Sequence, residues 1–441
     1  MEVEEVIPSA KRLIKSLRDV GYDFSTAVAD IVDNSIEWGA TVVNIDVKYS
    51  AKDSWVRIAD NGKGMDEEQI KEAMRFGSER TYNKDALGKF GLGLKTASLS
   101  QCRYLAVASR NIAHGKISQY CWDLDHIERV DKWEIVKISD KKIGEVVLGP
   151  LNKDKGTGTV VWWWKLDRIL EYKHPRSEVA QTRVATMCRD LESHLAMVFH
   201  RFLSGDVEGR EKIKISINGN LIAPWDPFAR KEKTIALQPG TLTVEYEEGV
   251  TGVIVLQPYI LPSQQEFSTP EEFNKAGGPG GWNHQQGFYI YRADRLIQSG
   301  GWCRLRVADE HTKLARIALS FSPDLDSAFK INVSKMKVQL PSEDRDWFDS
   351  SVKTLVKAAR ERYDGKEKGG RSPSGSSRNE PPKSISTSVS HIKNTETGDS
   401  SKMWTLEELE EKILKLAKPY QRLMLKKIFD KLKKNLGVKD E

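Results

Sequence analysis

The stretch Asp60-Asn61-Gly62-Lys63-Gly64 decides how this chain is interpreted. The residues before it, Trp55 to Ala59, alternate β-branched and apolar positions with others, which predicts a strand. That strand runs into an acidic residue and two glycines, and glycine lets the backbone approach a flat or anionic group closely. An Asp at a strand end can also accept a hydrogen bond from an exocyclic amino group. Because Asp, Asn and Gly are ordinary turn residues, the stretch alone does not separate a ligand site from a simple turn.

A helix with regularly spaced polar residues is predicted before this strand. Ser25 is its candidate N-cap, the helix spans residues 26 to 38 with an apolar stripe, and Gly39 ends it. Asp30 and Asn34 are four residues apart and therefore share one helix face. A solvated polar face is the simpler explanation for such a pair, so its meaning depends on the neighbouring motifs.

A glycine-rich run follows the strand. Residues 88 to 93 have the spacing G-x-x-G-x-G and open a helix predicted over 94 to 99. Glycine-rich backbone at a helix N-terminus favours a phosphate group, because free N–H groups and the positive end of the helix dipole point at it. The run is neither a dinucleotide fingerprint nor a P-loop, since the order of its residues is wrong for both. Residues 77 to 89 have little periodicity and are expected to form a mobile loop over a ligand.

The remaining pattern predicts two α+β regions and a helical tail. Strands are expected at 104–109, 117–122, 133–138 and 160–164, then after a long helix at 177–203 also at 213–217, 242–246, 252–259, 287–292 and 314–321. Trp162, Trp163 and Trp164 are interpreted as a strand buried on both faces rather than as a base-stacking platform. The expected domains are 1–172, 173–345, a connecting helix at 346–363, a flexible Gly/Ser/Pro/Lys-rich linker at 364–401 and an amphipathic helical tail at 402–441.

Composition excludes several classes of protein. The 441 residues are 39% hydrophobic and 30% charged, so the chain can build real cores. Its four cysteines are scattered without a C-x-x-C pair, which argues against a zinc site or a disulfide framework. His194 and His200 are six residues apart, which is not metal-ligand spacing on a helix. No apolar run approaches the roughly 18 residues of a membrane span, and the N-terminus lacks a secretory signal, so we expect a cytoplasmic protein without membrane contact.

The three motifs in this order resemble the Bergerat-type ATP-binding fold of the gyrase, chaperone, histidine-kinase and MutL (GHKL) superfamily. Within it, residues 30–37 (D-I-V-D-N-S-I-E) and 87–98 (L-G-K-F-G-L-G-L-K-T-A-S) are similar to the motifs of microrchidia (MORC)-like and MutL-like ATPases. The resemblance is specific over 22–165 and looser over 177–345. It implies an α+β protein, in which a Bergerat-fold α/β sandwich is followed by a transducer-like (S5-like) α+β domain and a helical tail.

The resemblance also implies a role for each motif residue, with ATP and Mg²⁺ as cofactors. Asn34 would hold the Mg²⁺ that bridges the phosphates, because oxygen ligands suit a hard cation. Asp60 would accept from the adenine amino group. Four residues would line or support the adenine: Gly62, Gly64, Met65 and Thr159. Seven would contact the phosphates: Gly88, Lys89, Phe90, Gly91, Leu92, Gly93 and Lys95. Lys337, with Lys335 as the alternative, would reach the γ-phosphate and stabilise charge there. The simpler interpretation of Lys335 and Lys337 is that they are two exposed lysines that alternate along a strand.

One departure concerns the catalytic base. The family places a glutamate where this chain has Asp30, and a carboxylate on a side chain one methylene shorter falls about 1.5 Å short, enough to slow hydrolysis by on the order of 10²-fold. Two functions follow: a slow Mg²⁺-dependent ATPase acting as an ATP-dependent homodimeric clamp, or an ATP-gated binding module without turnover. A histidine kinase is disfavoured, because no histidine precedes His114.

The biological role is the least determined part of the interpretation. The resemblance suggests DNA and the proteins of a restriction, DNA-modification or anti-phage defence system as partners. The net charge of +6 is compatible with DNA, and residues 401–441 carry eleven Lys/Arg against seven Asp/Glu, a net +4. The tail also has an apolar stripe, so self-association and DNA contact both remain open for it.

Overall fold

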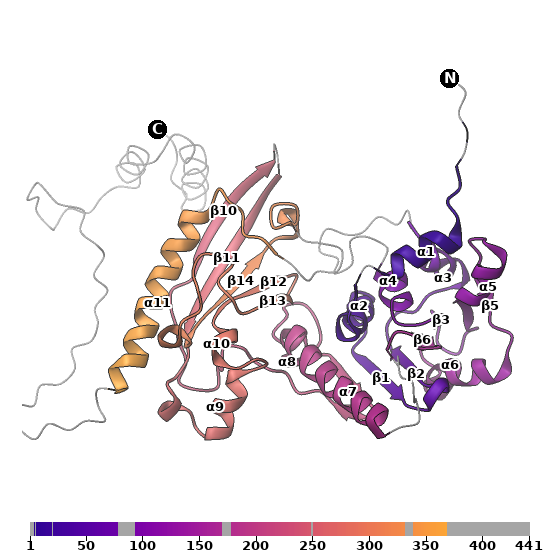
Figure 1. The fold of residues 1–441 in the computed structure, drawn as a ribbon, viewed down its shortest axis with the longest axis horizontal. Helices are drawn as coiled ribbons and strands as arrows, with labels where there is room; N and C mark the ends of the chain where they lie inside the picture. The colour runs from indigo at the N-terminus through magenta and orange to yellow at the C-terminus, as the bar shows by residue number, and fades with distance from the viewer. Residues whose placement is uncertain are drawn as a thin grey trace, which may run out of the picture. The chain divides into compact units, whose positions relative to one another are not determined.

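The computed structural model describes residue 4 and residues 6–19, 21–77, 93–169, 178–247, 250–330 and 338–367. Its first sheet has eight strands, and all neighbours are antiparallel except β1 and β7 (Figure 1). In spatial order the strands are β5 (Val136–Lys137), β4 (Ser118–Asp123), β3 (Tyr104–Arg110), β6 (Gly158–Trp164), β2 (Trp55–Asp60), β1 (Val42–Lys48), β7 (Lys214–Ile217) and β8 (Asn220–Leu221).

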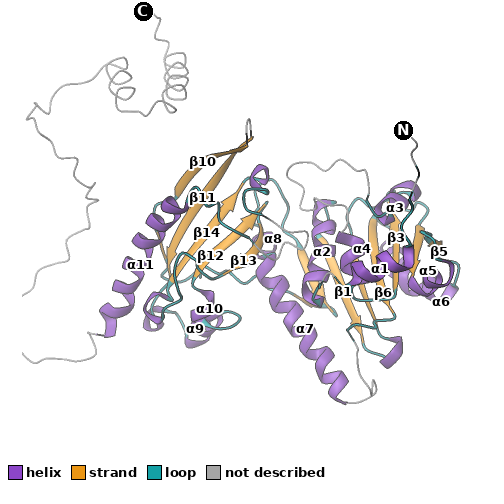
Figure 2. Cartoon of the chain, turned by 45° about the horizontal axis from the view of Figure 1, so that its top comes forward, coloured by secondary structure: helices purple, strands orange, loops and turns teal. Residues whose placement is uncertain are grey.

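Helices cover both faces of this sheet. One face packs against α1 (Ala10–Arg18), α2 (Phe24–Glu37), α4 (Gly93–Leu99) and α7 (Glu178–Val198), while α6 (Lys141–Asp154) covers the other (Figure 2). Trp163 joins the core beneath α2 and Trp162 joins the core beneath α6, each at most 3% exposed. The prediction that the tryptophan run forms a strand buried on both faces is therefore confirmed. Shorter helices in this part are α3 (Glu67–Met74), α5 (Leu124–Val130) and α8 (His200–Ser204).

Aspartate side chains cap both α3 and α2. The Asp66 side chain accepts from Gln69 N in a full capping box at α3. The predicted Ser25 cap of α2 is wrong, because Asp23 accepts from Thr26 N at 2.9 Å and starts the helix at Phe24. Asp and Ser are comparable N-caps, so the residue type alone does not decide between Asp23 and Ser25.

Two glycines allow the close packing around the end of β2. Gly64 has φ +68°, and a Cβ there would lie 1.9 Å from the carbonyl oxygen of Arg110. Gly158 has φ +151°, and a Cβ there would lie 2.1 Å from the carbonyl oxygen of Asp60. No other residue fits either position without moving the backbone. Gly64 is thus required by the packing of the protein itself, whether or not a ligand binds nearby.

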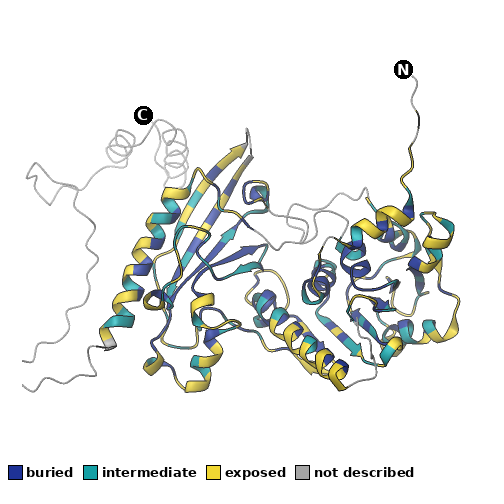
Figure 3. Ribbon diagram, in the orientation of Figure 1, coloured by how far each residue is buried: buried dark blue, intermediate teal, exposed yellow. Residues whose placement is uncertain are grey.

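A second, six-stranded sheet follows. Its order is β10 (Gly240–Glu247), β11 (Val250–Ile260), β14 (Ala315–Phe321), β12 (Gly287–Arg292) and β13 (Arg295–Ser299), with β9 (Ile235–Ala236) paired to β11. α9 (Pro270–Gly277) and α10 (Trp282–Gln285) precede β12. α11 (Arg345–Glu367) buries Phe348, Val352 and Leu355 in the core of this sheet. The outer sides of α7 and α11 are exposed, whereas the inner strands are buried (Figure 3).

The two-sheet α+β architecture agrees with the predicted fold class. Two details modify the expected layout: β7 and β8 follow residue 172 but complete the first sheet, and α11, placed near the expected connecting helix at 346–363, is a packed part of the second core. α5, α6 and β13 were not predicted, and most of the expected linker and all of the tail at 402–441 lie outside the described residues. Within the described part of the chain, no helix is both long and apolar enough to cross a membrane.

Candidate nucleotide site

The Asp60 carboxylate is the meeting point of three chain segments. Its Oδ1 accepts from the backbone N–H of Gly62 at 2.9 Å and of Thr159 at 3.2 Å. Its Oδ2 accepts from the hydroxyl of Ser35 at 2.9 Å. Thr159 is also the register partner of Asp60 across β2 and β6. The carboxylate therefore fastens α2, β6 and the Gly62 turn to the end of β2.

This carboxylate retains capacity for a further donor. A carboxylate offers roughly four acceptor positions, and the three bonds above leave one at Oδ2. Burial raises the pKa of Asp60, and the hydrogen bonds from Gly62, Ser35 and Thr159 oppose that shift. A ligand amino group donating to Oδ2 would complete the set. The acceptor expected for adenine is thus chemically suited to that role.

A serine missed by the sequence analysis extends this network. The Ser109 hydroxyl accepts from Met65 N at 2.8 Å and lies 2.8 Å from the Thr159 hydroxyl. It also contacts the Gly158 carbonyl at 2.8 Å. Met65 and Thr159, both expected near the adenine, are therefore held together by the end of β3. Ser109 carries no motif, so only the pairing of β3 with β6 could have identified it.

Asp30 is buried in the middle of α2, at 4% exposure. Its Oδ2 accepts from the Tyr22 hydroxyl at 2.9 Å, and a Cβ on Gly93 would lie 3.8 Å from the same oxygen. Burial first, and then the Asp30 carboxylate, raise the pKa of Tyr22, so the hydroxyl stays a donor at neutral pH. The predicted base and the last glycine of the phosphate run, 63 residues apart in sequence, are thus neighbours in the structure.

The direction of α2 orders these groups. Asp30 and Ser35 are five residues apart, which is about 7.5 Å along a helix axis. Asp60 meets the helix at Ser35, whereas Gly93 meets it at Asp30. Asn34 lies between them and is partly exposed, while its neighbours Asp33 and Ser35 are buried. Going back along α2, the contact with the predicted purine acceptor at Ser35, the predicted metal ligand Asn34 and the predicted base Asp30 therefore follow one another.

Lys95 is placed differently from the expectation of a phosphate ligand. Its side chain is 2% exposed, and its Nζ donates to the Ala73 carbonyl at 3.0 Å beside the Phe76 ring. Burial lowers the pKa of Lys95 to about 8. The ammonium group therefore lies against α3 and the segment after it, and its contact with phosphate remains a prediction.

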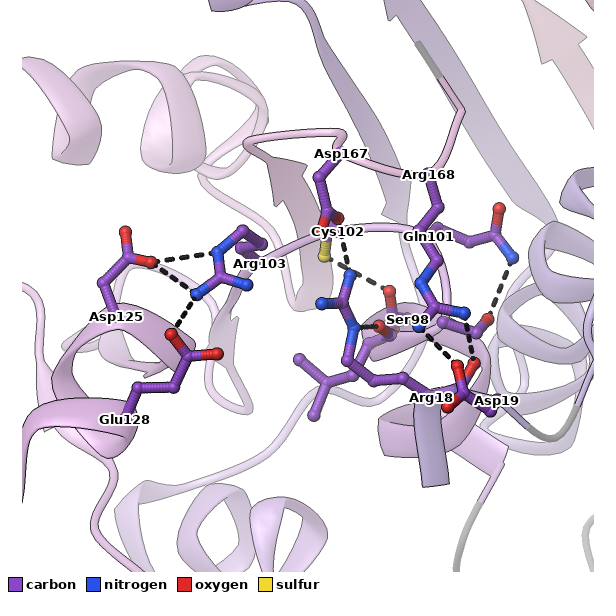
Figure 4. Close-up of polar contacts among 12 residues, drawn as sticks. Arg18, Asp19, Ser98, Gln101, Cys102, Arg103, Asp125, Glu128, Asp167 and Arg168 are labelled. Atoms are coloured by element: carbon purple, nitrogen blue, oxygen red, sulfur yellow. Dashed lines mark hydrogen bonds and ion pairs between the residues drawn. The ribbon is translucent and has the colours of Figure 1, made fainter. Parts of the chain in front are cut away.

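A buried arginine anchors the segment that carries Tyr22. Arg18 at the end of α1 donates to the Leu99 carbonyl at 2.7 Å and pairs with Asp167 at 2.5 Å (Figure 4). Gln101 donates to the Tyr22 carbonyl at 3.0 Å. A cavity of about 730 Å³ is lined by Arg18, Tyr22 and Gln101 among others, but none of Asp30, Asn34 and Asp60 lines it. This cavity is therefore distinct from the predicted nucleotide site.

Several predicted site residues lie outside the described residues. They are Gly88, Lys89, Phe90, Gly91 and Leu92 of the glycine run, and Lys335 and Lys337. In the described ranges no group of three His, Cys, Asp or Glu side chains is arranged to hold a metal ion. His200 lies 2.8 Å from the Tyr291 hydroxyl, and burial lowers its pKa to about 3, so it is a histidine of the core.

The chain has relatives over this same region. Residues 22–157 match the family described as Histidine kinase-, DNA gyrase B-, and HSP90-like ATPase. Over 98 residues the chain is 34% identical to Protein MICRORCHIDIA 1 and 31% identical to Protein MICRORCHIDIA 6, both of Arabidopsis thaliana. Each match covers 21% of this chain and 15% of the relative's own length. Residues 22–157 are therefore a GHKL-type ATPase domain, and this N-terminal region is distantly similar to the microrchidia proteins.

Proposed function

We propose that the chain binds Mg²⁺·ATP on the α2 side of the first sheet and hydrolyses it slowly. The observation that carries this proposal is the order of groups along α2, with the Asp60 acceptor at Ser35 and Asp30 beside Gly93. The GHKL family suggests ATP binding and hydrolysis in general terms. The assignment of individual residues is our own inference.

The residues have distinct roles in this proposal. Asp60 accepts from the adenine amino group, and Thr159 and Ser35 hold its carboxylate in place. The amide oxygen of Asn34 is a ligand for Mg²⁺, which supplies positive charge at the phosphates when bound. Asp30 orients the attacking water and accepts its proton. The shortness of the Asp30 side chain, together with its contact to Tyr22, supports slow rather than fast turnover.

The Asn34→Ala variant tests this assignment. Alanine removes the amide oxygen proposed as the Mg²⁺ ligand, so we expect Mg²⁺-dependent ATP hydrolysis to fall by at least about 10²-fold. The measurement is phosphate release by purified protein. Asn44→Ala is the matched control, because Asn44 lies on β1 and its Oδ1 accepts from Ser216 at 2.7 Å, away from α2. Hydrolysis that survives Asn34→Ala unchanged would remove the assignment.

A second function, ATP-gated binding without turnover, is favoured by the burial of Asp30 at 4% exposure and its contact with Tyr22. The Asp30→Glu variant separates the two functions. A glutamate restores the side-chain length that the family resemblance implies, and its neighbour Gly93 has no side chain. We expect a several-fold rise in turnover with ATP affinity nearly unchanged, measured by phosphate release and by titration calorimetry. Asp30→Asn, which removes the base, is expected to lower turnover by about 10²-fold or more and to leave a measurable residual rate. No hydrolysis in the wild type or in Asp30→Glu would support the binding module.

The wider role is also a proposal. We infer an ATP-dependent homodimeric clamp that acts with DNA and with proteins of a defence or DNA-modification system. The likeness to microrchidia proteins and the mildly basic net charge of +6 support it.

Particle mass in solution tests the clamp. With Mg²⁺ and a non-hydrolysable ATP analogue, we expect light scattering to report twice the mass of the nucleotide-free chain, because nucleotide would stabilise the closed pair. Asn34→Ala is expected to keep the nucleotide-free mass. A wild-type mass that the analogue does not change would leave the dimeric clamp without support.

A further inference from the structure

The acidic side chains of α2 are contacted by an arginine from the second sheet. Arg295, the first residue of β13, donates through Nε to the Asp33 carboxylate at 2.8 Å. Its Nη2 lies 3.6 Å from Asp30 Oδ1. All three side chains are at most 5% exposed. One guanidinium group thus reaches two acids that are about one helical turn apart, and the nearer of them in sequence, Asp33, is 262 residues from Arg295.

The two oxygens of Asp30 therefore have different partners. Tyr22, just before α2, contacts Oδ2 at 2.9 Å, and Arg295 contacts Oδ1. A buried carboxylate is costly unless a cation or hydrogen-bond donors compensate it, and a planar guanidinium provides both charge and direction. Removing one partner of such a buried set leaves the other charge uncompensated.

The turn before Arg295 is held in place by further contacts. Ala293 and Asp294 have φ of +47° and +64°, as in a two-residue hairpin turn with both central residues left-handed. Asp294 pairs with Arg201 of α8 at 2.7 Å, and the Arg201 guanidinium lies 3.5 Å from the Tyr291 ring centroid. The hairpin therefore delivers Arg295 to α2 from a fixed position.

We propose that Arg295 is a positioning residue of the ATPase site: it holds the Asp30 carboxylate in its working orientation and makes hydrolysis depend on the docked β12–β13 hairpin. This inference rests on the proposed ATPase function. The Arg295 side chain binds Asp33 and lies near Asp30, whereas Ser35, Gly62 and Thr159 hold Asp60, so the effect of Arg295 is expected on turnover rather than on adenine recognition.

The test compares Arg295→Met with a matched control. Arg292→Met removes a neighbouring buried arginine that pairs with Asp326 at 2.7 Å within the second sheet. We expect Arg295→Met to lower single-turnover ATP hydrolysis by about 10-fold or more, with ATP affinity within about three-fold of wild type. Arg292→Met is expected to leave turnover per folded molecule within about three-fold. Arg295→Lys keeps the charge but not the fork, and is expected to be intermediate.

A double-mutant cycle establishes that Arg295 acts through Asp30. Since Asp30→Asn removes the base, adding Arg295→Met to it is expected to cause no further loss. Equal loss of affinity and turnover, a response matching Arg292→Met, or losses that multiply in the double variant would overturn the inference. Should Arg295→Met fail to fold, as judged by circular dichroism, the same comparisons are made with Arg295→Lys.

The outcomes for the two proposals differ. A wild-type chain that binds no ATP overturns the proposed function itself. A wild-type chain that hydrolyses ATP while its Arg295 variants behave like Arg292→Met overturns only the positioning role. A wild-type chain that binds ATP without hydrolysing it leaves Arg295 no base to orient, and so overturns the inference while nucleotide binding stands.

Discussion

The hydrogen bonds to the Asp60 carboxylate are the interaction on which the predicted site depends. Ser35, Gly62 and Thr159 donate to it from three segments that are far apart in sequence. A charged acceptor with several donors is among the stronger polar arrangements in a protein. Because these donors fix the carboxylate before any ligand arrives, a ligand amino group meets an oriented acceptor and little reorganisation is needed.

The second constraint is that the buried helix α2 carries two acidic side chains whose charges need partners inside the protein. α2 is buried along most of its length, yet it carries Asp30 and Asp33 inside the protein. Tyr22 donates to Asp30 on one side, and Arg295 of the second sheet donates to Asp33 on the other. The chemistry expected of the first sheet is therefore tied to the second sheet by a direct polar contact. This makes the second sheet part of the site's electrostatics rather than a separate module.

Sequence reasoning succeeded where the signal was local. The strand at Trp55–Asp60 and the helix begun by Gly93 follow from periodicity and glycine placement. The convergence of Asp60 with Thr159 was anticipated through the family resemblance, and the structure pairs them across β2 and β6. Ser25 failed as a cap because Asp23 offered an equivalent side chain two residues earlier.

The residues that sequence reasoning missed are those whose role depends on distant contacts. Tyr22 and Ser109 belong to no recognised motif, and Arg295 begins β13, a strand that was not predicted. The need for glycine at Gly64 was attributed to a ligand, whereas the Arg110 carbonyl already requires it. Such contacts arise from tertiary packing, and they cannot be predicted from the spacing or the composition of residues along the chain.

Recognition of the purine by Asp60 is the central claim, and a comparison of ATP with inosine triphosphate tests it most directly. Inosine has a carbonyl oxygen at C6 in place of the amino group and, as a consequence, a proton on N1, so it would set the C6 carbonyl oxygen, an acceptor, against the Asp60 carboxylate. Titration calorimetry with Mg²⁺ is expected to show inosine triphosphate binding at least about 10²-fold more weakly than ATP. In Asp60→Asn the preference is expected to shrink, because an amide can donate to the carbonyl oxygen. Equal affinities for the two nucleotides in the wild type would contradict the account.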